Sequence, residues 1–199
     1  LANARGVDVG AGANLYPSLA MLPFCRQLDL REFSTPNVVW LSKQVKGFDD
    51  TWDAFWSVYQ KNPAYAAVEN PRATLAAIAS VKRSNIFELP KRTWDLGTMF
   101  FVACSLSTDM QVFHLATRRF VRSLKRGAPF AAAFMEGSIG YPVADARFPA
   151  VGISTKEVAE SLAPVAYDDV FIERITSGDN PLRDGYSGGM ILAVGRAAG

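Results

Sequence analysis

Two closely spaced glycines near the start of the chain have a type and spacing suited to ligand binding. Gly10 and Gly12 follow a run typical of a β-strand, residues 5–9, and precede a helical pattern. A glycine turn between a strand and a helix lets a ligand approach the backbone without interference from Cβ atoms, and it directs helix N-terminal amides toward that ligand. The dinucleotide-binding pattern G-x-G-x-x-G is incomplete because Leu15 stands at the third glycine position. The ligand therefore need not carry phosphates.

Two acidic residues follow the turn at a distance that suits the hydroxyls of a ribose. Glu32 comes twenty residues after Gly12, just beyond a second strand expected over residues 24–30. A carboxylate at this position can accept hydrogen bonds from a ribose diol. Asp29, within the expected strand, is the alternative acceptor. The reading without a ligand is a tight turn at the two glycines and a solvated acid at Glu32.

The elements that position these residues alternate between short β-like runs and helix-length amphipathic stretches, which predicts an α/β domain built on a mainly parallel sheet. The region 37–81 is expected to be mostly helical, with an aromatic stripe at helical spacing that is more typical of a core than of a cofactor site. Asp109 and Ser154 are expected to begin two later helices, which end at 125–127 and at Leu162. The remaining expected strands are 94–105, 129–135, 167–175 and 190–194, with a short strand-to-loop segment at 85–89.

Composition limits the classes of function. Lys and Arg number 21 and Asp and Glu 19, a formal charge of +2, which is too balanced for a nucleic-acid-binding or membrane-binding surface. With 49% hydrophobic residues, the 199-residue chain can bury a core as one domain. Its apolar stretches are short: 99–104, for example, has six residues, against the ~18 that a membrane span needs. We expect no nucleic-acid or membrane partner.

Cysteine and histidine usage gives no sign of a metal site. Cys25 and Cys104 lie far apart within apolar runs, so neither a disulfide framework nor a cysteine-based zinc site is indicated. The single histidine, His114, falls in the middle of an expected helix, which disfavours a serine hydrolase. We expect no metal and, because there is no signal-peptide pattern, a cytoplasmic protein, either a monomer or a weak homodimer.

Two motifs resemble those of a known family. Residues 7–16, VDVGAGANLY, and residues 30–37, LREFSTPN, resemble the S-adenosylmethionine-dependent small-molecule N-methyltransferases of the nicotinamide, phenylethanolamine and thioether or indolethylamine type. The likeness is greatest to a bacterial, actinobacterial branch. Looser matches follow in the family's order, so that the resemblance covers nearly the whole chain: 94–96, 124–127, 145–148, 154–158 and 189–193.

The resemblance implies a fold and a cofactor. The fold is a Rossmann-like methyltransferase sheet of seven strands, mostly parallel with an antiparallel last strand, and with helices on both faces. The cofactor is S-adenosylmethionine, with S-adenosylhomocysteine as its product. Glu32 would hold the ribose hydroxyls, and Asn85, where the family has an acid, would bracket the adenine together with Ile86. The other residues implied to bind or support the cofactor are Asp8, Gly10, Ala11, Gly12, Tyr16 and Asn37.

The resemblance also implies a small-molecule substrate, most often an amine. Asp145 matches an acidic contact to the substrate, Asp184 lies in the loop that delivers another contact, and Tyr186 offers an aromatic face to a cation. Relatives carry a tyrosine-bearing lid before the first motif, and this chain begins at Leu1, so we expect a single domain, 1–199, without the lid. A non-catalytic domain that senses the methyl donor or its product is the alternative. A nicotinamide-dependent oxidoreductase is disfavoured by the incomplete glycine pattern and by the absence of Tyr-x-x-x-Lys.

Overall fold

The computed structural model describes residues 3–143, 146–176 and 188–199. Contacts between residues divide the chain into two compact units. The first unit comprises Leu1–Glu88 and Trp94–Thr98, and the second comprises Leu89–Thr93 and Met99–Gly199. Among the described residues, no helix is both long and apolar enough to cross a membrane.

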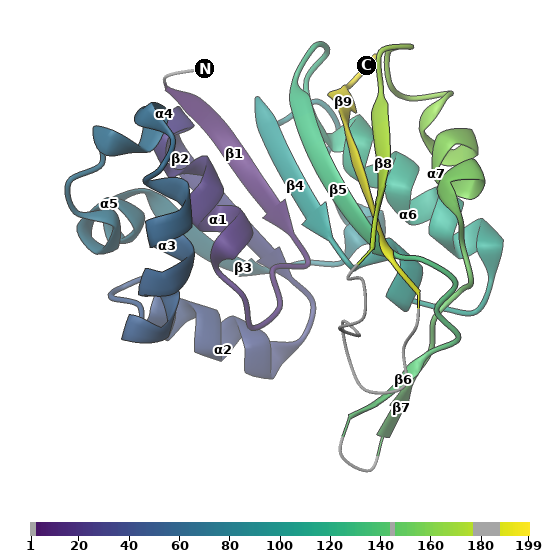
Figure 1. Cartoon of the computed structure of the whole chain (residues 1–199), viewed down its shortest axis with the longest axis horizontal. Coiled ribbons are helices and arrows are strands. Elements are labelled where there is room, and N and C mark those ends of the chain that lie inside the picture. The colour runs from purple at the N-terminus through teal and green to yellow at the C-terminus, as the bar shows by residue number, and fades with distance from the viewer. Residues whose placement is uncertain (1–2, 144–145, 177–187) are drawn as a thin grey trace. The chain divides into compact units, whose positions relative to one another are not determined.

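The first unit begins with β1 (Ala4–Val9), which lies parallel to β2 (Cys25–Glu32) and to β4 (Leu96–Phe100), while β2 lies parallel to β3 (Ala79–Arg83). Figure 1 shows these strands in purple to teal, with the helices of the unit around them. The helices are α1 (Tyr16–Met21), α2 (Thr35–Gln44), α3 (Asp53–Tyr59), α4 (Pro63–Ala66) and α5 (Pro71–Ile78), and the short 3-10 turns are η1 (Leu22–Phe24), η2 (Asp50–Trp52) and η3 (Ile86–Glu88).

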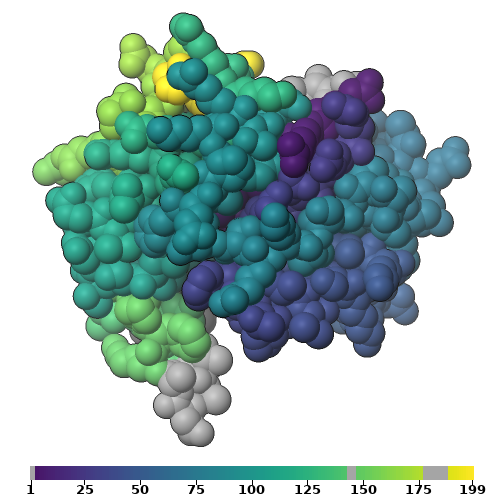
Figure 2. Space-filling view, turned by 180° about the vertical axis from the view of Figure 1, so that it is seen from behind, coloured from purple at the N-terminus to yellow at the C-terminus, as the bar shows by residue number. Residues whose placement is uncertain are grey.

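Leucines hold the helices of the first unit against one face of its strands. Leu28 and Leu30 alternate along β2 and pair in register with Ala79 and Val81 of β3. They form one buried cluster with fully buried leucines of the helices. Because side chains alternate along a strand, Asp29 and its neighbours in register point to the other face. On that face, Gln27 and Ser80 are exposed. Figure 2, the view from behind, shows residues of the first unit, coloured purple and blue, at the surface.

The second unit is built on α6 (Met110–Ser123), α7 (Thr155–Leu162) and the strands β5 (Pro129–Met135), β8 (Phe171–Ile175) and β9 (Met190–Arg196). Phenylalanines of α6 pack edge-to-face on those of β5, with Phe113 at 5.5 Å from Phe134 between ring centroids. A 3-10 turn, η4 (Ala103–Ser105), precedes α6. A separate hairpin joins β6 (Tyr141–Val143) to β7 (Ala146–Phe148).

The strands follow the order β3-β2-β1-β4-β5-β9-β8 in a seven-stranded sheet. β9, the last strand in the sequence, is antiparallel to its neighbours β5 and β8, whereas β1, β2, β3 and β4 pair in parallel. The predicted fold class, a mostly parallel Rossmann-like sheet with an antiparallel last strand, is therefore confirmed.

Several predicted boundaries were wrong. The region expected to be helical up to residue 81 ends instead in the strand β3, whose apolar Ala79 and Val81 alternate with exposed polar residues. The apolar run 94–105 is a strand only over 96–100, since the backbone of Phe101 adopts a φ of +62° and the chain turns away. The segment 85–89 contains a 3-10 turn rather than a strand. The first half of the expected strand 167–175 lies before β8 begins, and the β6–β7 hairpin was not predicted.

Candidate functional site

The glycine turn after β1 is hydrogen-bonded to the end of β2. Gly10 and Gly12 have φ values of +68° and +60°, in the left-handed region that favours glycine. The backbone N–H of Gly10 donates to the carbonyl of Arg31 at 2.6 Å. The N–H of Gly12 donates to Oε2 of Glu32 at 2.9 Å. The turn predicted from sequence is thus present, and it is fastened to the adjacent strand.

Glu32 is the last residue of β2 rather than a loop residue beyond the strand, and it is 7% exposed. Its Oε2 accepts from Gly12, and its Oε1 accepts from the backbone N–H of Ser34 at 2.7 Å. A carboxylate offers about four acceptor positions. The two backbone donors fix the orientation of the carboxylate and leave further acceptor capacity for a ligand.

Asp8 lies in β1, two residues before Gly10, and is buried in the first unit. It is 1% exposed and accepts hydrogen bonds from the hydroxyls of Ser18 on α1, at 3.0 Å, and Thr98 on β4, at 2.8 Å. Burial raises the pKa of Asp8 to about 6, although the two hydroxyl donors act in the opposite direction. The residue therefore ties β1 to α1 and β4.

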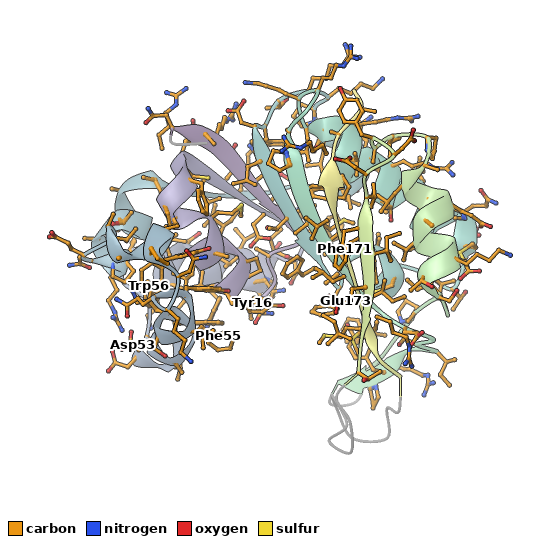
Figure 3. All side chains as sticks on the ribbon, turned by 45° about the horizontal axis from the view of Figure 1, so that its top comes forward. Tyr16, Asp53, Phe55, Trp56, Phe171 and Glu173 are labelled. Carbon is orange, nitrogen blue, oxygen red and sulfur yellow. The ribbon has the colours of Figure 1, made fainter. Side chains whose placement is uncertain are left out.

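Tyr16 is the first residue of α1, four residues after Gly12. Its ring stacks on Phe55 of α3, with centroids 5.8 Å apart and planes 16° apart (Figure 3). Burial raises the pKa of Tyr16 to about 12, with the charge of Asp8 adding to the effect. Ala11 is buried in the turn, and Asn37 is half-buried in the first turn of α2.

Asn85 and Ile86 follow β3. The N–H of Ser84 donates to the carbonyl of Glu32 at 2.8 Å, which joins this segment to the end of β2. Oδ1 of Asn85 accepts from the N–H of Phe87 at 3.1 Å, so one of its lone pairs is already used, and Ile86 is 8% exposed. Because β1, β2 and β3 are parallel, the predicted cofactor residues that follow them lie at the same edge of the sheet.

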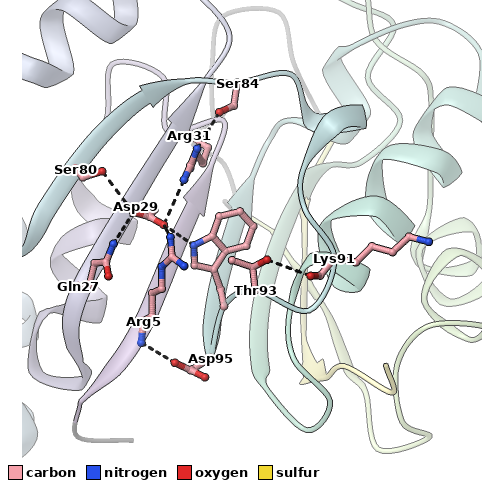
Figure 4. Close-up of polar contacts among 10 residues, drawn as sticks. Arg5, Gln27, Asp29, Arg31, Ser80, Ser84, Lys91, Thr93 and Asp95 are labelled. Carbon is pink, nitrogen blue, oxygen red and sulfur yellow. Dashed lines mark hydrogen bonds and ion pairs between the residues drawn. The ribbon is translucent and has the colours of Figure 1, made fainter.

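Asp29, the alternative acceptor, lies in the middle of β2, where donors of the protein itself already occupy its carboxylate. Its carboxylate accepts from Arg5 at 2.8 Å and from the indole N–H of Trp94 at 2.6 Å, and it pairs with Arg31 at 3.4 Å (Figure 4). Burial acts to raise the pKa of this carboxyl, but the bond from Trp94 and the two arginine charges outweigh it and hold the pKa below its ordinary value. Sequence reasoning did not associate Trp94 with this carboxylate.

The residues proposed to contact a substrate, Asp145, Asp184 and Tyr186, lie outside the described residues. Strands β6 and β7 run antiparallel on either side of positions 144 and 145. In the part of the chain that the structure describes, no group of three or more His, Cys, Asp or Glu side chains is arranged to hold a metal ion.

Comparison with solved structures identifies the fold. A methyltransferase from Methanosarcina mazei, described as S-adenosylmethionine-dependent, superposes with a TM-score of 0.62 at 12% identity, over 98% of this chain and 93% of that one. The N-methyltransferase NodS from Bradyrhizobium japonicum, in complex with S-adenosyl-L-homocysteine, gives 0.62 at 13%, over 100% and 80%. The chain has the fold of the S-adenosylmethionine-dependent methyltransferases.

This methyltransferase fold does not by itself define a reaction. The [4+2]-cyclase SpnF shares it, with a TM-score of 0.59 at 15% identity over 100% of this chain and 77% of that one. No protein-family model matches the sequence, and no curated protein matches it significantly. The activity must therefore be argued from the site.

Proposed function

We propose that the chain binds S-adenosylmethionine at the edge formed by β1, β2 and β3 and transfers its methyl group to a small-molecule amine. The observation that carries the proposal is the carboxylate of Glu32, held at the end of β2 by the N–H groups of Gly12 and Ser34. This arrangement puts a fixed acceptor beside a turn whose glycines let a ligand approach the backbone.

The residues at this edge fit an adenosyl donor. The remaining acceptor capacity of Glu32 suits the two hydroxyls of a ribose, and Ile86 offers an apolar contact to a purine. The glycine turn suits the amino-acid part of the molecule. The fold neighbour NodS, which holds S-adenosyl-L-homocysteine, supports the same choice.

When bound, S-adenosylmethionine supplies an electrophilic methyl group, which the lone pair of an acceptor takes in an in-line displacement while the bonding pair stays on sulfur. The protein's part is to bind, orient and exclude water. An amine that attacks must be unprotonated or lose a proton. Asp145 and Asp184 are the carboxylates we propose for holding the amine or accepting that proton, and Tyr186 is the proposed aromatic contact.

Calorimetric titration with S-adenosylhomocysteine, S-adenosylmethionine and NAD tests the first half of the proposal. We expect S-adenosylhomocysteine and S-adenosylmethionine to bind and NAD not to bind. Binding of NAD alone would overturn the proposal in favour of an oxidoreductase.

A screen with radiolabelled S-adenosylmethionine against pools of amines, thiols and alcohols tests the second half. We expect label to enter the amine pool, and to be lost in Asp145→Asn but retained in the surface variant Asp168→Asn. Tight donor binding with no transfer to any pool would favour the sensor domain instead.

A further inference from the structure

Helix α1 is too short to hold its own position. It has six residues, its N-cap position is occupied by Leu15 without a side-chain hydrogen bond, and it begins directly after the glycine turn. Isolated helices of this length are unstable in water because nucleation costs more than a few hydrogen bonds return. The helix, and the turn that leads into it, must therefore be fixed by contacts from elsewhere.

Two tyrosines from the segment between α2 and β3 supply such contacts. The hydroxyl of Tyr59, at the end of α3, donates to the carbonyl of Tyr16 at 2.9 Å. The hydroxyl of Tyr65, in α4, donates to the carbonyl of Ala20 at 2.7 Å. The two hydroxyls thus hold opposite ends of α1, and we call this pair the tyrosine clamp.

Aromatic packing gives the tyrosine clamp a defined geometry. The rings of Tyr59 and Tyr65 are stacked, with centroids 5.3 Å apart and planes 17° apart. The indole of Trp56 meets both rings edge-on, at 6.4 Å and 5.8 Å. Burial raises the pKa of Tyr59 to about 12, so its hydroxyl keeps its proton, and remains a donor, throughout the range in which a protein is assayed.

The two ends of α1 differ in their relation to the site. Tyr59 holds the first residue of the helix, four residues from Gly12, and the ring of that same residue stacks on Phe55. Tyr65 donates to the carbonyl of Ala20, four residues after Tyr16, at the other end of the helix. Loss of the first contact frees the helix start and the turn attached to it, whereas loss of the second frees the other end.

We infer that Tyr59 is a positioning residue for the cofactor: through the carbonyl of Tyr16 it fixes the start of α1 and so keeps the Gly10–Gly12 turn in the geometry that receives the adenosyl donor. This inference rests on the proposed function. It assigns a role in the cofactor site to Tyr59, which belongs to the aromatic stripe that is more typical of a core in the sequence.

The matched variants Tyr59→Phe and Tyr65→Phe test it, since each loses one hydroxyl and one hydrogen bond to a carbonyl of α1. S-adenosylhomocysteine is titrated into both by calorimetry, and thermal unfolding is followed in parallel. We expect similar losses of stability, with binding weakened about three- to tenfold in Tyr59→Phe alone. Unchanged affinity in Tyr59→Phe, or an equal loss in both variants, would overturn the inference. Failure of the unaltered protein to bind would overturn the proposed function itself.

Hydrogen exchange on the ligand-free protein provides a readout that does not depend on the ligand. We expect the amides of residues 10–16 to exchange faster in Tyr59→Phe than in Tyr65→Phe, and equal rates would contradict the role. If Tyr59→Phe does not fold in plain buffer, both variants are compared in the presence of a stabilising osmolyte such as trimethylamine N-oxide. Equal exchange rates of residues 10–16 in the two variants would overturn the inference there as well.

Discussion

The backbone N–H of Gly12 and the carboxylate of Glu32 are joined by a 2.9 Å hydrogen bond across twenty residues of sequence. The bond connects the turn after β1 to the end of β2, the place at which parallel α/β sheets commonly bind their ligands. It makes the shape of the turn and the orientation of the carboxylate depend on each other, so a change in either one alters both.

Replacement of Glu32 should weaken cofactor binding. In Glu32→Gln, one of the two backbone donors, from Gly12 or Ser34, would face an amide NH2 rather than an oxygen. We expect S-adenosylmethionine to bind more weakly by about 1–3 kcal/mol in this variant and in Glu32→Ala, as measured by calorimetry. Glu160→Gln, an exposed carboxylate on α7, is the control and should bind normally.

The opposite pattern is expected at Asp29. Asp29→Asn removes the negative charge that the arginines of its cluster share, one of which, Arg31, is largely buried. We expect the free energy of unfolding in urea to fall by on the order of 3 kcal/mol, with little change in the cofactor affinity of the folded protein. A large loss of affinity without a loss of stability would identify Asp29 as the ribose acceptor in place of Glu32.

A side chain at Gly12 should lower the stability of the protein because of the backbone conformation at this residue. At Gly12 an added Cβ would have its nearest neighbour at 3.8 Å, the carbonyl oxygen of Gly10, so there is no clash, but the φ of +60° is unfavourable for alanine. We expect Gly12→Ala to lose about 1–2 kcal/mol of stability in chemical denaturation and to bind the cofactor more weakly. Gly47→Ala, which places its Cβ in open space, should lose neither.

Strong local signals explain what could be predicted from sequence. Strand β5 matches its predicted range, 129–135, because an apolar run there lies between turn residues. Helix α7 begins at Thr155, directly after the N-cap Ser154, and the expected capping box of Ser154 with Glu157 is present. Strand β3 was missed because α5 ends at Ile78 and the strand begins at Ala79, with no glycine or proline between them to mark the change.

The site was predictable only in part. The spacing of Gly12 and Glu32 was sufficient to place both at the ends of neighbouring parallel strands, since a strand, a short helix and a second strand occupy about that length. The partner of Asp29 was not predictable, because the indole of Trp94 lies 65 residues further along the chain. Contacts at such a separation depend on sheet order, which periodicity does not reveal.

Titration of Asp8 should make stability fall between about pH 4 and pH 6. Its pKa is 3.8 in an unfolded chain and about 6 when buried, so the folded state binds the proton more tightly. The stability that this proton provides is complete below pH 3.8 and is lost as the pH rises through 6. Asp8→Asn keeps an acceptor for Ser18 or Thr98 and cannot ionise. We expect its free energy of unfolding at pH 7.5 to equal or exceed that of the unaltered protein, by up to about 3 kcal/mol.

Chemical denaturation at several pH values between 4 and 8 measures this effect. In the unaltered protein and in the exposed control Asp168→Asn, the pH dependence from Asp8 should be present, and in Asp8→Asn it should be absent. A pH profile that is the same in all three proteins would mean that the Asp8 carboxyl titrates alike in the folded and unfolded chain. The buried hydroxyl contacts to Ser18 and Thr98 would then hold the charged form at no net cost, which full burial argues against.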